Sequence, residues 1–311
     1  MANLRRAKSV HAAAPLALAA ILMAAFPGKA GSAYHFNKMK EDRIASALAN
    51  IHRRNPGLDA RIAAVSGAFV GTPYKLGPLG EGGTGEFDRD PLYSFRQADC
   101  TTFVETVMAL SLEPELGKAL ADTLRRIRYE DGKVGYAARN HFTEVDWIPN
   151  NAAAGFLADI TEAVAGGKTR YAAKTISKRD WYAHKTLDDI QGFGSAPAAE
   201  KEAKLKALQA LGKDLPDQEV RLPYVPVEAL AEALPRIPSG TVANVVREGR
   251  PDKPVLITHQ TLVIDKGGKK LLRHAAYGRQ VEDVPVLDYF AKFSTATWRV
   301  LGVNLNAVRS R

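Results

Sequence analysis

The hydrophobic pattern of the chain changes near Glu219. Before that point, apolar residues recur every three to four positions and predict helices over residues 38–54, 58–70, 100–112, 115–127 and 152–165. From Glu219 onward the apolar runs are short and alternate with polar residues, which is typical of strands at 220–225, 241–247, 255–265, 270–276 and 298–306. Because helices and strands are segregated along the chain, the sequence predicts an α+β fold with N-terminal helices packed on a C-terminal antiparallel β-sheet.

Three segments interrupt this pattern. Residues 71–90 are rich in glycine and contain two prolines, so we expect a loop that leads toward Cys100, and such loops often line a cleft. Residues 131–149 look irregular. Residues 176–218 are rich in charge and have little hydrophobic alternation, which indicates a partly helical insertion whose lysines face water.

Residues 1–33 have the pattern of a secretory signal peptide. Arg5, Arg6 and Lys8 precede an apolar run from Ala12 to Phe26, and small residues follow up to Ala33. The apolar run is shorter than the ~20 residues that usually span a membrane. We therefore expect cleavage near Ala33 and a mature chain, residues 34–311, that forms a single catalytic domain in the periplasm or outside the cell.

Composition and charge narrow the class of partner. The chain is 46% hydrophobic and 25% charged, as in ordinary globular proteins. Removal of residues 1–33 takes four basic residues and no acidic one, which lowers the net charge from +9 to +5. The remaining basic residues are scattered, so we expect no nucleic-acid partner and a mild attraction to anionic polymers of the cell envelope.

Cys100 is the only cysteine, so no disulfide partner is expected within the chain. Asp99 is a suitable N-cap, which places Cys100 in the first turn of the helix 100–112. The helix dipole there favours the thiolate and lowers a pKa that is otherwise near ~8.5. A single thiol in an exported chain indicates a reactive group. The alternative is a small buried side chain at a helix start.

Two histidines offer a base for this thiol. A cysteine nucleophile needs a base within hydrogen-bond reach and a third group that orients the base. His259 lies on a predicted strand, where alternation gives it the same face as Ile257 and Thr261. A turn centred near 266.5 would place His274 directly opposite His259. The alternative for each histidine is an ordinary strand residue with its hydrogen bonds satisfied.

Short motifs occur along the chain in a recognisable order: Gly71-Thr72-Pro73-Tyr74, Asp99-Cys100-Thr101-Thr102-Phe103-Val104-Glu105, Arg139-Asn140-His141-Phe142 with Asp146-Trp147, Ile237-Pro238-Ser239-Gly240, and Thr258-His259 with His274-Ala275. The ordered set resembles the N-acetylmuramoyl-L-alanine amidase-like branch of the NlpC-type papain-like cysteine hydrolases of bacterial cell walls.

The resemblance implies a papain-like fold and hydrolysis of the amide between the lactyl group of N-acetylmuramic acid and L-alanine. The substrates would be peptidoglycan fragments, including anhydro-muropeptides, and no metal or other cofactor is required. On this mapping Cys100 is the nucleophile, His259 the base and His274 the orienting residue. The main-chain N–H of Cys100, with Tyr74 nearby, would stabilise the oxyanion. Asp99 would cap the helix and contact substrate.

Other functions stay open at this point. His141 and Glu144 are three residues apart and suit a zinc site, which would make the protein a metal amidase. Cleavage inside the stem peptide, between D-glutamate and diaminopimelate, would use the same thiol. A third possibility is that the chain is a non-catalytic module that binds the cell wall. His141 and Trp147 either shape the cleft or simply pack.

Overall fold

The computed structural model describes residues 34–310, so the predicted signal peptide at 1–33 lies outside the described residues. Its centre is an eight-stranded sheet whose neighbouring strands are antiparallel, in the order β2-β3-β8-β4-β5-β6-β7, with β1 paired to β8. The strands are β1 (Leu157–Asp159), β2 (Arg170–Ile176), β3 (Gln218–Pro226), β4 (Thr241–Arg247), β5 (Ile257–Lys266), β6 (Lys269–Ala275), β7 (Val281–Pro285) and β8 (Val300–Val308).

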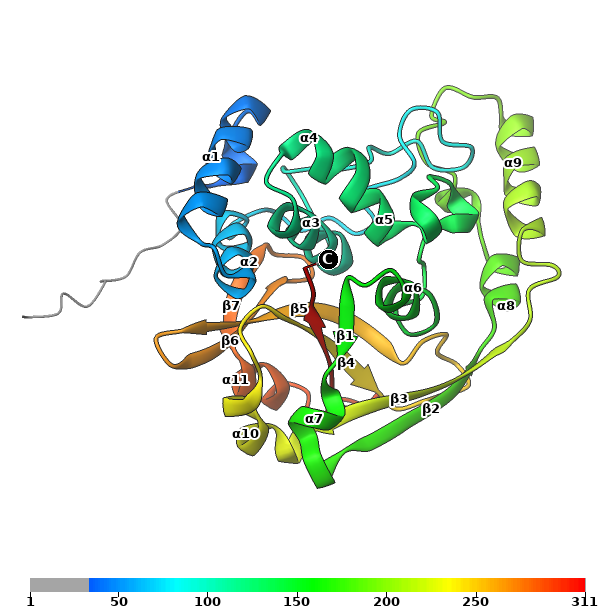
Figure 1. The fold of residues 1–311 in the computed structure, drawn as a ribbon. Coiled ribbons are helices and arrows are strands. Elements are labelled where there is room, and N and C mark those ends of the chain that lie inside the picture. Colours follow the sequence, from blue (N-terminus) through cyan, green and yellow to red (C-terminus); the bar gives the residue numbers. More distant parts are fainter. Residues whose placement is uncertain (1–33, 311) are drawn as a thin grey trace, which may run out of the picture. The chain divides into compact units, whose positions relative to one another are not determined.

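Helices occupy both sides of the sheet (Figure 1). The longer ones are α1 (Glu41–Arg54), α2 (Leu58–Ala68), α3 (Cys100–Leu112) and α9 (Ala198–Ala210). The shorter ones are α4 (Leu116–Lys118), which continues through a π-helical turn (Ala119–Thr123) into α5 (Leu124–Arg128), and α6 (Ile148–Ala153), α7 (Thr161–Ala165), α8 (Lys178–Ala183), α10 (Leu230–Ala233) and α11 (Val286–Ala291).

The larger core lies between the N-terminal helices and one face of the sheet. Phe103 and Val107 of α3 are fully buried in the same cluster as Leu262 of β5. Figure 1 shows α1, α2 and α3 together on this side. Burial of this apolar surface is the main favourable term that holds α3, and with it Cys100, against the sheet.

A second core covers the opposite face. Val263 of β5 and Leu272 of β6 pack there with Tyr289 and Phe290 of α11. Successive residues of β5 therefore point to opposite cores, as the pleat of a strand requires. This alternation decides on which face each histidine of the site lies.

The α+β fold class is confirmed, with most elements close to their expected bounds. The helix expected at 152–165 is wrong, because Gly155 has φ +78 and the chain there forms the short strand β1 between α6 and α7. The expected helix 115–127 contains a π-helical turn. Strands β2 and β7 and helices α10 and α11 were not expected.

The segment predicted as an insertion leaves and rejoins the sheet at neighbouring positions, since Ile176 of β2 pairs with Gln218 of β3. Between them lie α8 and α9. Tyr182 and Leu208 of this segment pack against Phe87 and Tyr136. Within residues 34–310, no helix combines the length and hydrophobicity that a membrane crossing needs.

Candidate active site

The start of α3 is fixed by a capping box. The Oδ1 atom of Asp99 accepts a hydrogen bond from the main-chain N–H of Thr102 at 2.8 Å, and the Asp99 N–H donates to the Thr102 hydroxyl at 3.0 Å. The Oδ2 atom accepts from the N–H of Gly77 at 3.1 Å, which ties the glycine-rich loop to the helix. The predicted N-cap is confirmed, and Cys100 is the first residue of the helix.

The Cys100 thiol is half-buried and protonated near neutral pH. Burial, and then the Asp99 carboxylate, raise its pKa to about 11, while hydrogen bonds from the main chain of Gln260 and from Thr101 act in the opposite direction. The expected lowering of this pKa is therefore wrong for the protein without substrate, because desolvation and a neighbouring negative charge both disfavour the thiolate.

His259 and His274 form a hydrogen-bonded pair, with 2.8 Å between Nε2 of His259 and Nδ1 of His274. The register between strands β5 and β6 differs from the expected one. Leu262 pairs with Arg273, which brings His274 opposite Thr261 and makes the two histidines diagonal neighbours. A shift of two residues keeps both side chains on one face, so the pair forms despite the error.

A β-bulge at Thr258 explains a second difference. Val245 of β4 pairs with His259, but its neighbour Val246 pairs with Ile257, so Thr258 is the extra residue. Ile257 packs with Val246 in a separate core, and so the expectation that His259 and Ile257 share a face is wrong. The bulge moves Ile257 to the other face, whereas His259 keeps the face of Thr261 and Val263, toward α11.

Tyr289 of α11 covers both imidazoles. Its ring stacks on His259 with 6.1 Å between centroids and meets His274 edge-on at 5.3 Å. Burial lowers the pKa of His259 to about 3 and that of His274 to about 4, with nearby positive groups contributing, including Lys292 and Arg279 at His274. Both imidazoles are therefore neutral above about pH 5, so one ring nitrogen of each is available as an acceptor.

The thiol and the imidazole pair come together where the start of α3 meets β5. Gln260, whose main chain hydrogen-bonds the Cys100 sulfur, directly follows His259. The Tyr289 phenol, which contacts both imidazoles, has its pKa raised by burial and then by the charge of a Cys100 thiolate. The structure thus brings together the three residues that the sequence singled out.

Tyr74 also lies close to Cys100 and Asp99. Its main-chain N–H donates to Arg279 at 3.0 Å, and Tyr74 forms a bridge with Ala98. Burial, followed by the charges of Cys100 and Asp99, raises the pKa of its phenol. Its ring contacts Tyr277 with 5.2 Å between centroids, and Tyr277 is 79% exposed.

Sequence patterns missed Gln260, Tyr277 and Tyr289. Tyr289 had a usable signal, since Pro285 precedes apolar residues at helical spacing, namely Val286, Tyr289 and Phe290. Tyr277 lies in the turn after β6, where no periodicity marks it. Gln260 contributes through its main chain, and the type of a residue does not predict a main-chain contact.

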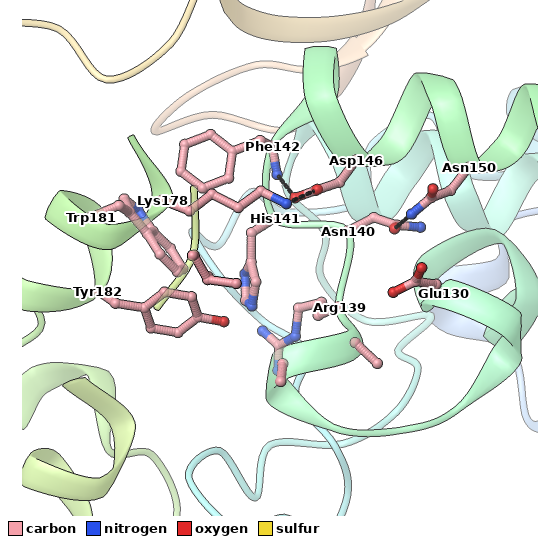
Figure 2. Close-up of a pocket in the computed structure, with 13 residues that line it drawn as sticks. Glu130, Arg139, Asn140, His141, Phe142, Asp146, Asn150, Lys178, Trp181 and Tyr182 are labelled. Carbon is pink, nitrogen blue, oxygen red and sulfur yellow. Dashed lines mark hydrogen bonds and ion pairs between the residues drawn. The ribbon is translucent and has the colours of Figure 1, made fainter. Parts of the chain in front are cut away.

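His141 and Trp147 lie in different environments. Trp147 is fully buried, and its indole N–H donates to Glu105 at 3.1 Å, so packing is the role that fits. His141 lines a pocket beside Lys178, Trp181 and Tyr182 (Figure 2). One of its ring nitrogens lies 2.8 Å from the main-chain oxygen of Tyr136.

The residues considered for a metal site have other partners. Glu144 accepts a hydrogen bond from the main-chain N–H of Leu256 at 2.5 Å, whereas the ring nitrogen of His141 contacts Tyr136. Over the described range 34–310, no group of three or more His, Cys, Asp and Glu side chains is arranged to hold a metal ion.

The candidate site thus consists of a helix start that carries a thiol, set against an antiparallel sheet that carries two neutral imidazoles. The chain belongs to the N-acetylmuramoyl-L-alanine amidase-like family, whose model matches residues 64–296. This membership assigns the protein to the amidase-like hydrolases of the cell wall.

Several solved structures are similar to this chain, and among them is a protein named an N-acetylmuramoyl-L-alanine amidase. A protein of Legionella pneumophila is 33% identical, with a TM-score of 0.78, and the match covers 86% of this chain and 95% of that one. An N-acetylmuramoyl-L-alanine amidase from Bacteroides uniformis is 25% identical, with a TM-score of 0.58 and coverage of 81% and 99%. A candidate xylanase from Bacteroides fragilis is 26% identical, with a TM-score of 0.53 and coverage of 79% and 100%. No match was found among curated proteins.

Proposed function

We propose that this protein is a cysteine-dependent N-acetylmuramoyl-L-alanine amidase. It cleaves the amide between the lactyl group and L-alanine in peptidoglycan fragments, and it releases an intact stem peptide. The observation that carries the proposal is the hydrogen-bonded pair of His259 and His274 next to Gln260, whose main chain contacts the Cys100 sulfur.

The first half of the reaction starts from neutral groups. His259 Nδ1 takes the proton of the Cys100 thiol as the sulfur attacks the amide carbonyl carbon, and a C–S bond forms. The main-chain N–H of Cys100 has no protein acceptor among the described residues and is available to the developing oxyanion, with Tyr74 beside it. The imidazolium of His259 then protonates the alanine nitrogen, and the C–N bond breaks.

The second half releases the sugar acid. His259 accepts a proton from water, whose oxygen attacks the thioester carbon, and the thiolate leaves and is reprotonated. For Nδ1 of His259 to accept a proton, its Nε2 must carry hydrogen and donate to His274 Nδ1. His274 therefore fixes both the tautomer and the ring orientation of His259, which is the role of the third member of a triad.

Contacts with substrate come from the loop before α3 and the turn after β6. We propose that the exposed ring of Tyr277, held against Tyr74, contacts the sugar or lactyl group of muropeptides, including anhydro forms. The carboxylate of Asp99 already accepts bonds from Thr102 and Gly77, so any contact it makes with substrate is secondary to capping. The proposed reaction differs from cleavage of a glycosidic bond, which uses two carboxylic acids that flank that bond.

Export belongs to the same proposal. The predicted signal at 1–33 would place the enzyme in the periplasm or outside the cell, where its substrate lies. Fractionation followed by mass determination tests this point: an intact chain starting at Met1 in the cytoplasm would contradict it.

The decisive test is mass spectrometry of defined muropeptides incubated with purified protein and, in parallel, with the Cys100→Ala variant. Free stem peptide and an intact muramyl sugar, absent with the variant, are expected. Cleavage between D-glutamate and diaminopimelate would keep the Cys100 mechanism and change the specificity to endopeptidase. Intact substrates with both proteins would favour the wall-binding module.

A further inference from the structure

A pocket of about 160 Å³ lies between the Arg139–Asp146 motif and the 176–218 segment (Figure 2). The mechanism above uses none of its residues. The motif contributes Asn140, His141 and Asp146, and α8 contributes Lys178 and Tyr182. Because both parts of the chain are needed to form it, the pocket exists only through the packing of the segment on the motif.

One end of the pocket is rich in hydrogen-bond donors. The Lys178 ammonium contacts Asp146 Oδ1, and the other oxygen of Asp146 accepts from the Phe142 N–H at 3.0 Å. An ammonium has three N–H groups, so Lys178 keeps donors for a ligand. Burial raises the pKa of Tyr182 to about 12, so its hydroxyl stays protonated, and it has no hydrogen-bond partner within residues 34–310. Figure 2 shows this hydroxyl directed into the pocket.

The other end is rich in acceptors. The Asn150 amide donates to Asn140 Oδ1 at 2.7 Å, which leaves Asn150 Oδ1 as an acceptor. The Glu130 carboxylate, drawn in Figure 2 beyond Asn140, has no ion-pair partner in the described part of the chain. Glu130 is exposed at this rim, and its negative charge is therefore available to a cation.

The remaining ionisable groups of the lining add no free charge. The Arg139 guanidinium is held by Glu81 and by Asp88, the latter at 2.9 Å. Burial lowers the pKa of His141 well below its ordinary value, so its ring is neutral. A donor end, where Lys178 is paired with Asp146 and keeps further N–H groups, thus faces an acceptor end with the carboxylate of Glu130, across a small volume.

We propose that this pocket binds the zwitterionic head group of an amino acid, with its carboxylate at Lys178 and Tyr182 and its ammonium at Glu130. The inference rests on the proposed function, since a stem peptide whose diamino acid keeps a free amine and carboxylate carries such a head group. The volume is below the 300–1,000 Å³ of pockets for drug-sized ligands and fits a head group with a few carbon atoms.

The position of the pocket agrees with a peptide that extends from the active site. Glu144, between pocket residues Phe142 and Asp146, is bonded to Leu256, which precedes His259 by three residues. Leu256 immediately precedes β5, and three residues of extended chain, shortened here by the bulge at Thr258, span at most roughly 10 Å. An extended peptide covers about 3.5 Å per residue, so the third residue after the scissile bond reaches this distance.

Calorimetric titration of the Cys100→Ala protein with a stem tripeptide tests the proposal, because this variant leaves the peptide intact. The peptide is used with its diamino-acid head group free and with that head group acetylated and amidated. We expect the blocked peptide to bind at least 10-fold more weakly. Glu130→Gln and Tyr182→Phe should each weaken binding of the free peptide about 5-fold, and both are small changes in shape. Asp131→Asn, the same change of charge one residue away from the lining, should have no effect.

Two results would overturn the inference: equal affinity for free and blocked peptides, or full affinity in both pocket variants. Hydrolysis of the complete muropeptide by the unmodified protein is measured in parallel. If hydrolysis is absent while the free tripeptide binds with the expected dependence on Glu130, the amidase proposal fails and the pocket stands. If hydrolysis occurs with the KM unchanged by Glu130→Gln, the pocket proposal fails alone.

Discussion

Helix α3 carries two ionisable groups with raised pKa values, and their surroundings differ. Cys100, at its first residue, is half-buried, and its sulfur is hydrogen-bonded by the main chain of Gln260, the residue that follows His259. Glu105 is 2% exposed and is enclosed by Arg128 at 2.7 Å and the Trp147 indole at 3.1 Å. In both cases burial is the largest cause of the raised pKa.

Glu105 and Cys100 differ in the groups that surround them. The carboxylate of Glu105 faces a fixed cation and a fixed donor in the core, so moving a proton there would leave a buried charge unpaired. The thiol of Cys100 lies beside the Asp99 carboxylate and has no fixed cation as partner among the described residues, so it is held in its neutral form and can give up its proton to a neighbouring base. A shifted pKa therefore indicates a site of acid–base chemistry only where a neighbouring group can accept or donate the proton.

The largest expected effect is on catalysis. His259→Ala should lower kcat/KM for muropeptide hydrolysis by about 10³-fold, because the general base is removed. Thermal stability should fall moderately, because His274 loses its hydrogen-bond partner and Tyr289 loses a packing contact, but the protein should remain folded. Steady-state kinetics and calorimetric melting measure the two quantities. His184→Ala, at an exposed histidine, is the control and should behave as the unmodified protein. A similar loss in both variants would contradict the role of His259.

The opposite result is expected at Glu105. Arg128→Met should destabilise the fold by about 3–5 kcal/mol, because Glu105 is left buried without its cation. Chemical denaturation measures this free energy of unfolding. Arg126→Met is the control, because Arg126 lies in α5 like Arg128 but is partly exposed. It should change the free energy of unfolding by no more than about 0.5 kcal/mol. Addition of Glu105→Gln to Arg128→Met should recover part of the loss, since Gln keeps an acceptor for Trp147. No loss in Arg128→Met would show that this pair does not support the core.

His274 is expected to act through His259. His274→Ala should lower kcat by about 10²-fold with a smaller change in KM, because the base loses its orientation. His274→Gln keeps an acceptor near the same place and should recover part of that loss. If Gln and Ala are equally impaired, the hydrogen bond between the imidazoles is not what positions the base.

The pH dependence separates this pair from ordinary histidines. With a His259 pKa of about 3, kcat/KM at pH 5 should stay within about two-fold of its value at pH 7, whereas a base of pKa 6.5 would lose about 25-fold. Because the unfolded chain binds protons below pH 6.5 and the buried imidazoles do not, stability should fall from pH 6.5 toward pH 4. An acid limb of the rate profile near pH 6.5 would contradict the neutral pair.

The smallest effect is expected at the exposed ring beside Tyr74. Tyr277→Ala should raise KM for sugar-bearing substrates about 3- to 10-fold, the range of one aromatic contact. Tyr277→Phe keeps the ring and should leave KM unchanged. An equal KM for Ala and Phe variants would remove Tyr277 from the substrate contacts.

Much of the fold follows from local patterns. The spacing of apolar residues located α1, α2 and α3 and the strands β3 to β6 and β8, because these elements bury one continuous face. The error at 152–165 has the same origin, since alanine-rich sequence favours helix while Gly155 adopts a conformation that ends it. Helix α10 has only four residues, too few for a helical period to be recognised, whereas the signal for α11 was present and was overlooked.

The sequence by itself singled out the candidate groups for chemistry: a single thiol behind an N-cap, two histidines on successive strands, and the motifs of the family. Only the tertiary structure decided how they meet. The bulge at Thr258 and the two-residue change in register depend on strand pairing across the sheet, which residue type does not encode. The protonation state of Cys100 was also decided there, because burial depends on everything that packs around the sulfur.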